Sequence, residues 1–351
     1  MVDSPPEEEV TGTWWAQEKP EEKFYGRLAF GNSTPTLELE GAPAEDLQRD
    51  EVAPPRTFHG EALSRTFTIH RVVLSETRWS GPRAQVSYRA QAVIEGCLID
   101  PNRTLLRDVF VRFAGLERWI GDDVFRTNFA WDDDEADKIE YRPGPIRKVP
   151  VAGRMPGQLQ ISTSSSIQGG GAGSRSARID HSSHFAFSAI DEMTFDHAMQ
   201  VAFHLKQAMS MFIDSAAIKE SVSVRLVDNE PYRLHSVHDE TITADADVDA
   251  FAARSNLTRF SEVGLGAAAT WLLLAPRYSE VASLAIEALH GRLPIQSSLI
   301  AATSAAEGLH RILMPQDREL DKTATRALRR RLITASPPEY REMVQDRKSV
   351  V

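Results

Sequence analysis

The chain has 351 residues, a hydrophobic content of 42%, a charged content of 26% and a formal net charge of −10. These values describe an ordinary soluble globular protein, and the length is typical of two domains. The single Cys97 excludes an internal disulfide and favours a reducing compartment. The acidic start has no signal-peptide pattern and no apolar run reaches the ~18 residues that span a bilayer. We therefore expect a cytoplasmic protein that makes no membrane contact.

The first hundred residues have the alternation of antiparallel strands. Residues 1–9 are acidic and rich in proline, and we expect them to form a disordered lead. The segments Phe24–Phe30 and Thr36–Glu40 alternate apolar and polar residues around a turn, which predicts a hairpin. Further strands are expected at 65–74, 84–99 and 108–113, before a helical turn at Leu116–Ile120. Strands without intervening helices indicate an antiparallel sheet or sandwich.

One long helix is predicted within this β-rich half. The segment 163–178 is rich in serine and glycine and is predicted to be a flexible insertion. A strand at 184–188 then leads to a helix that begins after Thr194 as N-cap. Its buried stripe is expected to be Phe195, Ala198, Met199, Ala202, Leu205, Met209 and Phe212. A hairpin at 222–227 and 232–237 completes a domain that we expect to span residues 10–244.

The remaining residues, 245–351, have a helical composition. Four helices are predicted, at 261–275, 278–292, 295–313 and 321–333, with Pro276, Pro294 and Pro315 at their junctions. The expected fold class is therefore α+β: an antiparallel β-rich domain with one long helix, followed by an all-α domain.

The helix at 295–313 carries the first candidate site. Helical spacing predicts a packed stripe formed by Leu299, Thr303, Ala306, His310 and Leu313. Glu307 lies one turn before His310 and Arg311, so three ionisable groups meet near one edge of the helix. Spacing alone favours a surface Glu–Arg pair beside a half-buried histidine, because functional clusters are rarer than such pairs.

A basic run follows in the last predicted helix. Arg326, Arg329, Arg330 and Arg331 could hold phosphates, because guanidinium groups match phosphate oxygens. The alternative is a solvated face of an amphipathic helix. The two ends of the chain differ in charge: residues 1–60 hold thirteen acidic and five basic residues, whereas residues 311–351 hold ten basic and six acidic ones.

No metal or cofactor site is expected from the sequence. The pairs His181/His184 and His235/His238 have a spacing of three residues, but in strands such residues point to opposite faces, and no cysteine supplements them. Arg233 and His238 match the Arg-x4-His form of a ribonuclease motif, but they lie in a predicted hairpin, and we interpret the match as coincidence.

The β-rich half resembles the amino-terminal domain of ApeA-type proteins. The residues that carry the resemblance follow one another in the family's order: Gly12-Thr13-Trp14-Trp15, Gly26-Arg27-Leu28, Leu37 to Gly41, His59-Gly60, Tyr88-Arg89-Ala90 and Val111 to Trp119. By physical reasoning these residues are scaffold, with buried tryptophan rings and a strand-end turn at His59-Gly60.

The helical half resembles the first part of the HEPN domain of the same proteins. The matching residues are Trp271, Arg277-Tyr278, Val281, Ser298-Leu299 and Ala305 to Arg311, the last in the family's Glu-Ala-x-His-Arg-like form. The resemblance implies an anti-phage defence protein of the HEPN class, a metal-independent endoribonuclease that acts on RNA as a homodimer after a phage-derived trigger.

One difference between this sequence and the family pattern bears on catalytic activity. The family's Arg-x4–6-His motif would belong after Arg311, yet no histidine follows His310. The resemblance therefore implies a helical domain cut short before its catalytic motif, with Glu307, His310 and Arg311 as accessory residues. Two alternatives remain: a non-catalytic module for ligand binding and dimerisation, or an inactive product.

Overall fold

A computed structural model describes residues 8–31, 34–43, 54–80, 83–122, 124–128, 138–169, 177–213, 217, 219–227, 233–239, 258–290, 294–313 and 330. It divides into two compact units, Met1–Ser279 and Glu280–Val351. The α+β class is confirmed, with an antiparallel β-rich amino-terminal part and helices in the carboxyl-terminal region. Among the described helices, none is long and apolar enough to cross a membrane.

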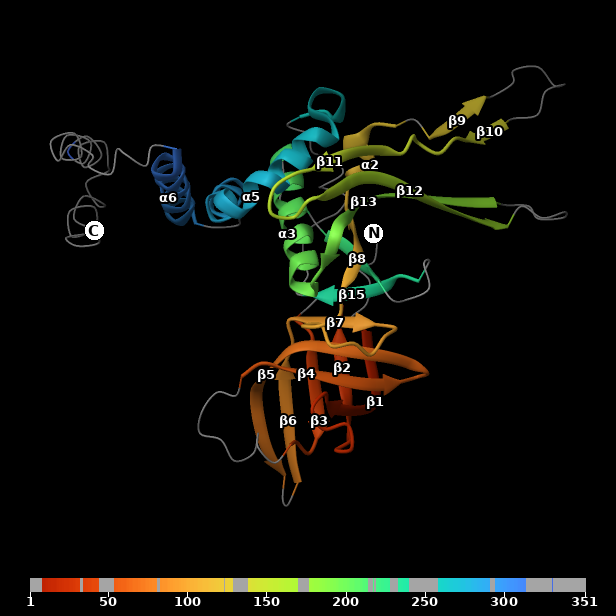
Figure 1. The fold of residues 1–351 in the computed structure, drawn as a ribbon, viewed down its shortest axis with the longest axis vertical. Helices are drawn as coiled ribbons and strands as arrows, with labels where there is room; N and C mark the ends of the chain where they lie inside the picture. Colours follow the sequence, from red (N-terminus) through yellow and green to blue (C-terminus); the bar gives the residue numbers. More distant parts are fainter. Residues whose placement is uncertain are drawn as a thin grey trace. The chain divides into compact units, whose positions relative to one another are not determined.

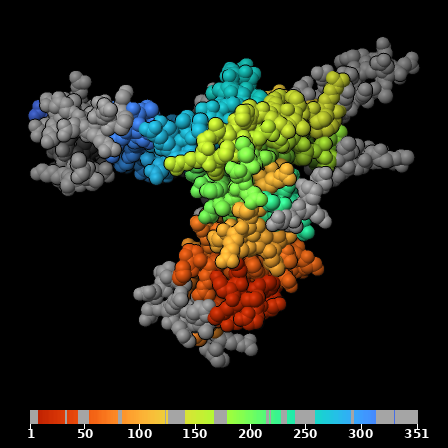
Figure 2. All heavy atoms as spheres, in the orientation of Figure 1, coloured from red at the N-terminus to blue at the C-terminus, as the bar shows by residue number. Residues whose placement is uncertain are grey.

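Six strands of the first unit close into a barrel (Figure 1). Each pairs antiparallel with the next, in the order β1 (Glu8–Ala16), β2 (Phe24–Phe30), β3 (Thr36–Glu40), β6 (Arg83–Arg89), β5 (Arg65–Ser80) and β4 (Arg56–Ala62), and β4 returns to β1. Their inward side chains form one core, which includes Trp14, Phe30, Phe58 and Phe67. Figure 2 shows these strands as a closely packed red and orange body.

Two expectations for the barrel are wrong. The end of the expected disordered lead is strand, because Glu8 pairs with Phe30. Gly60 lies within β4 opposite Trp14, not in a strand-end turn. The ring of Trp14 covers this glycine so closely that a Cβ there would lie 1.9 Å from the ring carbon Cε3. The Gly-Thr-Trp-Trp and His-Gly motifs thus form one cross-strand packing unit.

An open antiparallel sheet follows the barrel. Its strand order is β7 (Ala92–Glu95), β15 (His235–Asp239), β14 (Lys219–Leu226), β8 (Leu106–Phe113), β13 (Ala177–Met193), β12 (Gly157–Gly169) and β11 (Arg147–Val151). β7 also pairs with β5 of the barrel, so it joins the two β structures. A separate hairpin consists of β9 (Phe125–Asn128) and β10 (Lys138–Tyr141).

Two segments differ from the sequence-based prediction. The expected strand at 84–99 is two strands, β6 and β7, because the chain leaves the barrel between them. Both ends of the expected insertion at 163–178 are paired strand, with Thr163 opposite Ser183 and Gly169 opposite Ala177. Serine and glycine content indicated a loop, but a long cross-strand ladder outweighs these weak propensities.

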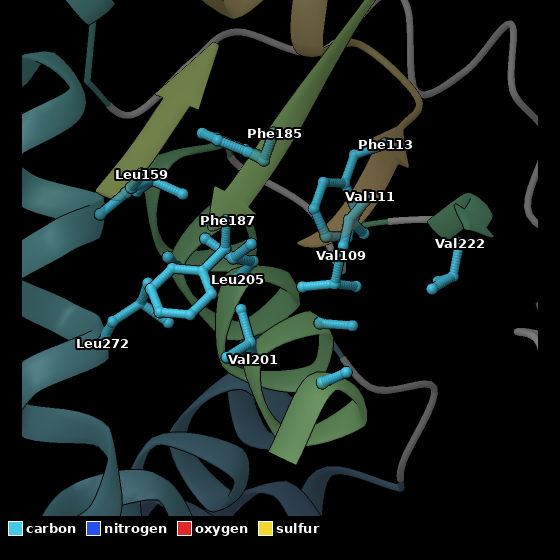
Figure 3. Close-up of a cluster of buried hydrophobic side chains, with 14 of the residues drawn as sticks. Val109, Val111, Phe113, Leu159, Phe185, Phe187, Val201, Leu205, Val222 and Leu272 are labelled. Atoms are coloured by element: carbon cyan, nitrogen blue, oxygen red, sulfur yellow. The ribbon is translucent and has the colours of Figure 1, made fainter. Parts of the chain in front are cut away.

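Helix α3 (Phe195–Phe212) packs on the inner face of the sheet. Thr194 is its N-cap, as predicted, and its hydroxyl accepts a hydrogen bond from the His197 amide at 3.3 Å. The predicted stripe is confirmed, with Phe195, Ala198, Ala202, Leu205 and Met209 buried and Met199 partly buried. Figure 3 shows Val201 and Leu205 pointing toward Phe187 and Val109 of the sheet, with Leu272 at one side.

A short helix, α2 (Leu116–Ile120), closes one end of this core. Its Trp119 stacks on Phe212 with ring centroids 5.0 Å apart and an interplanar angle of 4°. Phe260, the first residue of helix α5 (Phe260–His290), meets the same indole edge-on at 4.9 Å. The early turns of α5 therefore belong to the core of the first unit, where Leu265, Ala268 and Leu272 are buried.

Pro276 does not end a helix, contrary to the prediction. Helix α5 continues through it, and its non-helical position is Gly264, with φ 63° and ψ −175°. An interior proline costs about 3 kcal/mol. Packing offsets this cost, because Leu272 and Ala275 are buried and the Gln207 amide donates to the Ser279 carbonyl at 2.8 Å.

In the second unit, α6 (Ile295–Leu313) packs through small residues. Ala301 and Ala305 are its buried residues, and a Cβ on Gly308 would lie 2.9 Å from Val281. The predicted packed stripe is wrong: Leu299 is 65% exposed and Leu313 56% exposed, and Thr303, Ala306 and His310 are also exposed. Small residues permit close approach of two helices, so they form the contact and leave the larger side chains outside.

Two further expectations cannot be placed on the structure. The expected domain boundary near residue 245 lies outside the described residues, as does the predicted helix at 321–333 except for residue 330.

Candidate functional site

The predicted accessory residues lie on the exposed side of α6. The Arg311 guanidinium donates to Glu307 Oε1 at 2.6 Å, one helical turn away. The two side chains are 74% and 57% exposed, and His310 is exposed beside them. An exposed pair at this spacing contributes only a few tenths of a kcal/mol. The pair orients Arg311 but encloses no site.

The predicted phosphate-binding arginines are mostly not described. Arg326, Arg329 and Arg331 lie outside the described residues, and Arg330 is an exposed helical residue. Their role stays a prediction.

The open sheet presents a polar constellation that the sequence reasoning missed. On β8, Val109 and Val111 point into the core, so the alternate residues Asp108, Phe110 and Arg112 point to the opposite face, here called the outer face. The register places three rows of side chains across this face. The central row is Lys148, Gln160, Ala186, Phe110, Ser223 and Ser236; the flanking rows are Ser162, His184, Arg112 and Ser221, and Gln158, Ser188, Asp108 and Arg225.

Phe110 is at the centre of this arrangement. Arg225 places its guanidinium carbon 5.2 Å from the centre of the Phe110 ring. The same guanidinium donates to Asp108 Oδ2 at 2.9 Å, and Ser188 donates to the other oxygen of that carboxylate. The Asp108 side chain is only 6% exposed, whereas Arg225 is 27% exposed. A buried carboxylate therefore holds the cation against the ring.

A second group lies across the ring from Arg225. His184 meets Phe110 edge-on at 5.6 Å, and its Nε2 shares a hydrogen bond of 2.8 Å with the hydroxyl of Ser162. Arg112 is 43% exposed and forms an ion pair of 2.6 Å through Nε with Glu220. The constellation thus contains two arginines, each held by its own carboxylate.

The ionisation of this second group follows from burial. Burial lowers the pKa of His184, and Arg112 lowers it further against the opposing effect of Glu117. Burial also raises the pKa of Glu220, against the attraction of Arg112. Near neutral pH the imidazole is therefore uncharged and can donate or accept a hydrogen bond at the outer face.

Two further histidines that the sequence singled out, His181 and His238, have partners of their own. His181 Nδ1 bonds the Tyr141 hydroxyl at 2.9 Å, and His238 packs on Phe30 and lies 3.5 Å from Glu95. Arg233 donates a hydrogen bond to the carbonyl of Gly96. Neither Arg233 nor His238 lies in a helix, whereas the family's Arg-x4–6-His motif lies on one. Within the described part of the chain, no group of three metal-ligating side chains converges.

Strand alternation was the signal that could have revealed the outer face. Asp108, Phe110 and Arg112 occupy every second position of one predicted strand, so their common face was readable. Their proximity to His184 and Arg225 was not, because it depends on pairing with β13 and β14.

Fold and site together define a protein whose amino-terminal part is β-rich: a filled barrel joined to a sheet with one polar face free of the core. The family model "ApeA N-terminal domain 1" matches residues 9–245 of the 351. The chain therefore belongs to the ApeA N-terminal domain family, which associates it with anti-phage defence. No curated protein and no solved structure matches the chain.

Proposed function

We propose that this chain is an anti-phage defence protein whose family domain recognises a phage-derived trigger and whose helical region is of the HEPN endoribonuclease class. Membership of the ApeA N-terminal domain family is the observation that carries this proposal. The helices α5 and α6 are consistent with a HEPN-like helical hairpin, and Glu307, His310 and Arg311 end α6 as the resemblance implies.

The proposed chemistry needs an arginine and a histidine at the scissile phosphate. One group must take the proton of the RNA 2′-hydroxyl while cations stabilise the charge that develops on phosphorus. Within these 351 residues no histidine follows His310, so no Arg-x4–6-His pair follows Arg311, and Glu307, His310 and Arg311 are proposed as accessory residues. Glu307 would then orient Arg311 at the edge of the cleft, and Arg326 with Arg329 to Arg331 would bind RNA phosphates.

A homodimer through α6 is part of the proposal. Large apolar side chains of α6 are exposed at Ile295 (84%), Leu299 (65%), Leu309 (41%) and Leu313 (56%). With Ala302 and Ala306 they follow the alternating four- and three-residue spacing of a coiled-coil seam. We call these six residues the α6 seam. Burial of a leucine side chain contributes about 1.5–3 kcal/mol, so the seam favours a second copy of the same helix.

The test uses the 351-residue protein with total RNA, read on a gel. We expect no cleavage, because the catalytic pair is absent. RNA cleavage that is lost in His310→Ala would show that His310 is catalytic and not accessory. In cells, expression of the gene from its native locus should reduce phage plating, and an unchanged plating efficiency would contradict the defence role.

A second candidate function is a non-catalytic binding module. The outer face favours it, because Phe110, Arg112 and Arg225 form a pre-oriented polar surface in a domain without other assigned chemistry. The DNA sequence after the codon for Val351 distinguishes the two candidate functions. An Arg-x4–6-His pair there supports the ribonuclease, whereas a stop codon supports the binding module.

A further inference from the structure

We propose that the outer face binds a single nucleotide, with the base stacked at Arg225 and Phe110 and the phosphate at Arg112. This site lies in the amino-terminal family domain and does not depend on the ribonuclease proposal.

The base position is built around the Arg225–Phe110 pair. The guanidinium carbon of Arg225 lies 5.2 Å from the centre of the Phe110 ring, and the guanidinium donates a hydrogen bond to the almost fully buried Asp108. The Arg225 side chain is 27% exposed, so part of it is accessible from solvent. Guanidinium planes and aromatic rings are the surfaces on which proteins stack bases. Because the hydrogen bond to Asp108 restrains the Arg225 side chain in advance, little side-chain entropy is lost on binding.

The phosphate position is on the same strand. Arg112 points to the outer face two residues from Phe110, which corresponds to roughly 6–7 Å along a strand. Its ion pair with Glu220 is formed through Nε, and the side chain is 43% exposed. The terminal guanidinium nitrogens are the donors that match phosphate oxygens in bidentate fashion. The Ser162–His184 pair lies next to Arg112 and offers further hydrogen bonds.

The composition of the face limits the ligand to one nucleotide. A strand of RNA needs a continuous basic track and several stacking rings. Phe110 is instead the one phenylalanine, tyrosine or tryptophan in the three rows, and Lys148 is their one lysine or arginine besides the two paired arginines. A protein partner is disfavoured as well, because the centre of a protein interface is depleted in charge, and here it would bury two ion pairs.

The experiment is equilibrium binding of AMP, GMP, UMP and CMP, with inorganic phosphate and a ten-nucleotide RNA as separate probes. Arg225→Gln removes the stacking plane, and Arg112→Gln removes the phosphate donor. Each should weaken binding of the preferred mononucleotide about tenfold or more. Arg27→Gln is the matched control, since Arg27 is also a half-exposed strand arginine paired with carboxylates, but on the barrel. The Arg27→Gln variant should bind the preferred mononucleotide with the affinity of the unchanged protein.

Three results would overturn the proposal. They are the absence of mononucleotide binding at millimolar concentration, binding that Arg225→Gln and Arg112→Gln leave intact, and binding of the RNA alone. Phe110→Leu keeps an apolar side chain at the ring position and provides a second test of stacking. Thermal melts of each variant separate lost binding from lost folding. Because no cleavage is measured, failure here and failure of the ribonuclease proposal are distinguishable.

Discussion

Replacement of Gly60 by alanine tests the idea that the family's His-Gly and Gly-Thr-Trp-Trp motifs are one packing unit. A Cβ on Gly60 would lie 1.9 Å from Trp14 Cε3 and 2.3 Å from Cζ3. Ordinary carbon contacts are about 3.5–4 Å, so the indole must move by roughly 1.5–2 Å. Trp14 has no exposed surface and lies against Phe67, with centroids 5.9 Å apart, so it has little room to move.

The expected cost is at the upper end of the range for overpacking, about 3 kcal/mol. For a unit of this size that corresponds to a fall in melting temperature of roughly 6–12 °C. The assay is thermal unfolding followed by near-UV circular dichroism, which reports the packing of Trp14.

Gly266→Ala is the matched control, because nothing lies within 4 Å of its Cβ position and helix α5 favours alanine over glycine. It should leave stability unchanged or raise it by up to about 1 kcal/mol. In addition, Trp14→Leu should offset part of the cost of Gly60→Ala, since the two changes share one space. Equal melting temperatures for Gly60→Ala and Gly266→Ala would refute the packing argument.

Three further predictions address the dimer, the helix cap and pH. Leu309→Glu in the α6 seam should convert the dimer to a monomer, as measured by light scattering after gel filtration. Ser304→Glu, at an exposed position away from the seam, should leave the dimer intact. A monomeric wild-type protein at all concentrations would contradict the proposed dimer. Thr194→Ala should lower the free energy of unfolding by about 0.5–1 kcal/mol in urea titration. The expected loss is at the lower end of the range for N-caps because the capping hydrogen bond is long, at 3.3 Å. Thr194→Ser should retain most of the stability, and equal losses for both variants would argue against capping. Burial lowers the pKa of His70 against the opposing charge of Asp196. The unfolded state therefore binds more protons, and stability present above about pH 6.5 should be lost as the pH falls. His70→Gln should reduce this pH dependence in urea titrations, and an unchanged dependence would show that other groups cause it.

Local patterns in the sequence were sufficient for elements whose stability is set by near neighbours. The hairpin of Phe24–Phe30 and Thr36–Glu40 followed from alternation around a turn, and α3 followed from its N-cap and apolar stripe. Strand alternation and helical spacing are fixed by backbone geometry, so they are readable without knowledge of the fold. The α+β class followed from the same patterns.

The tertiary structure decided what depends on distant partners. Closure of the barrel requires β5 to pair with β4, β6 and β7, and no local pattern specifies a strand with three partners. Pro276 stays within a helix because Leu272 and Ala275 are buried in a core formed by residues far along the chain. In α6 both apolar faces satisfied helical spacing, and only close packing of small residues selected Ala301 and Ala305 as the inner face. The outer face depends on pairing in the same way, because the register of β8 with β13 and β14 brings His184 and Arg225 to Phe110.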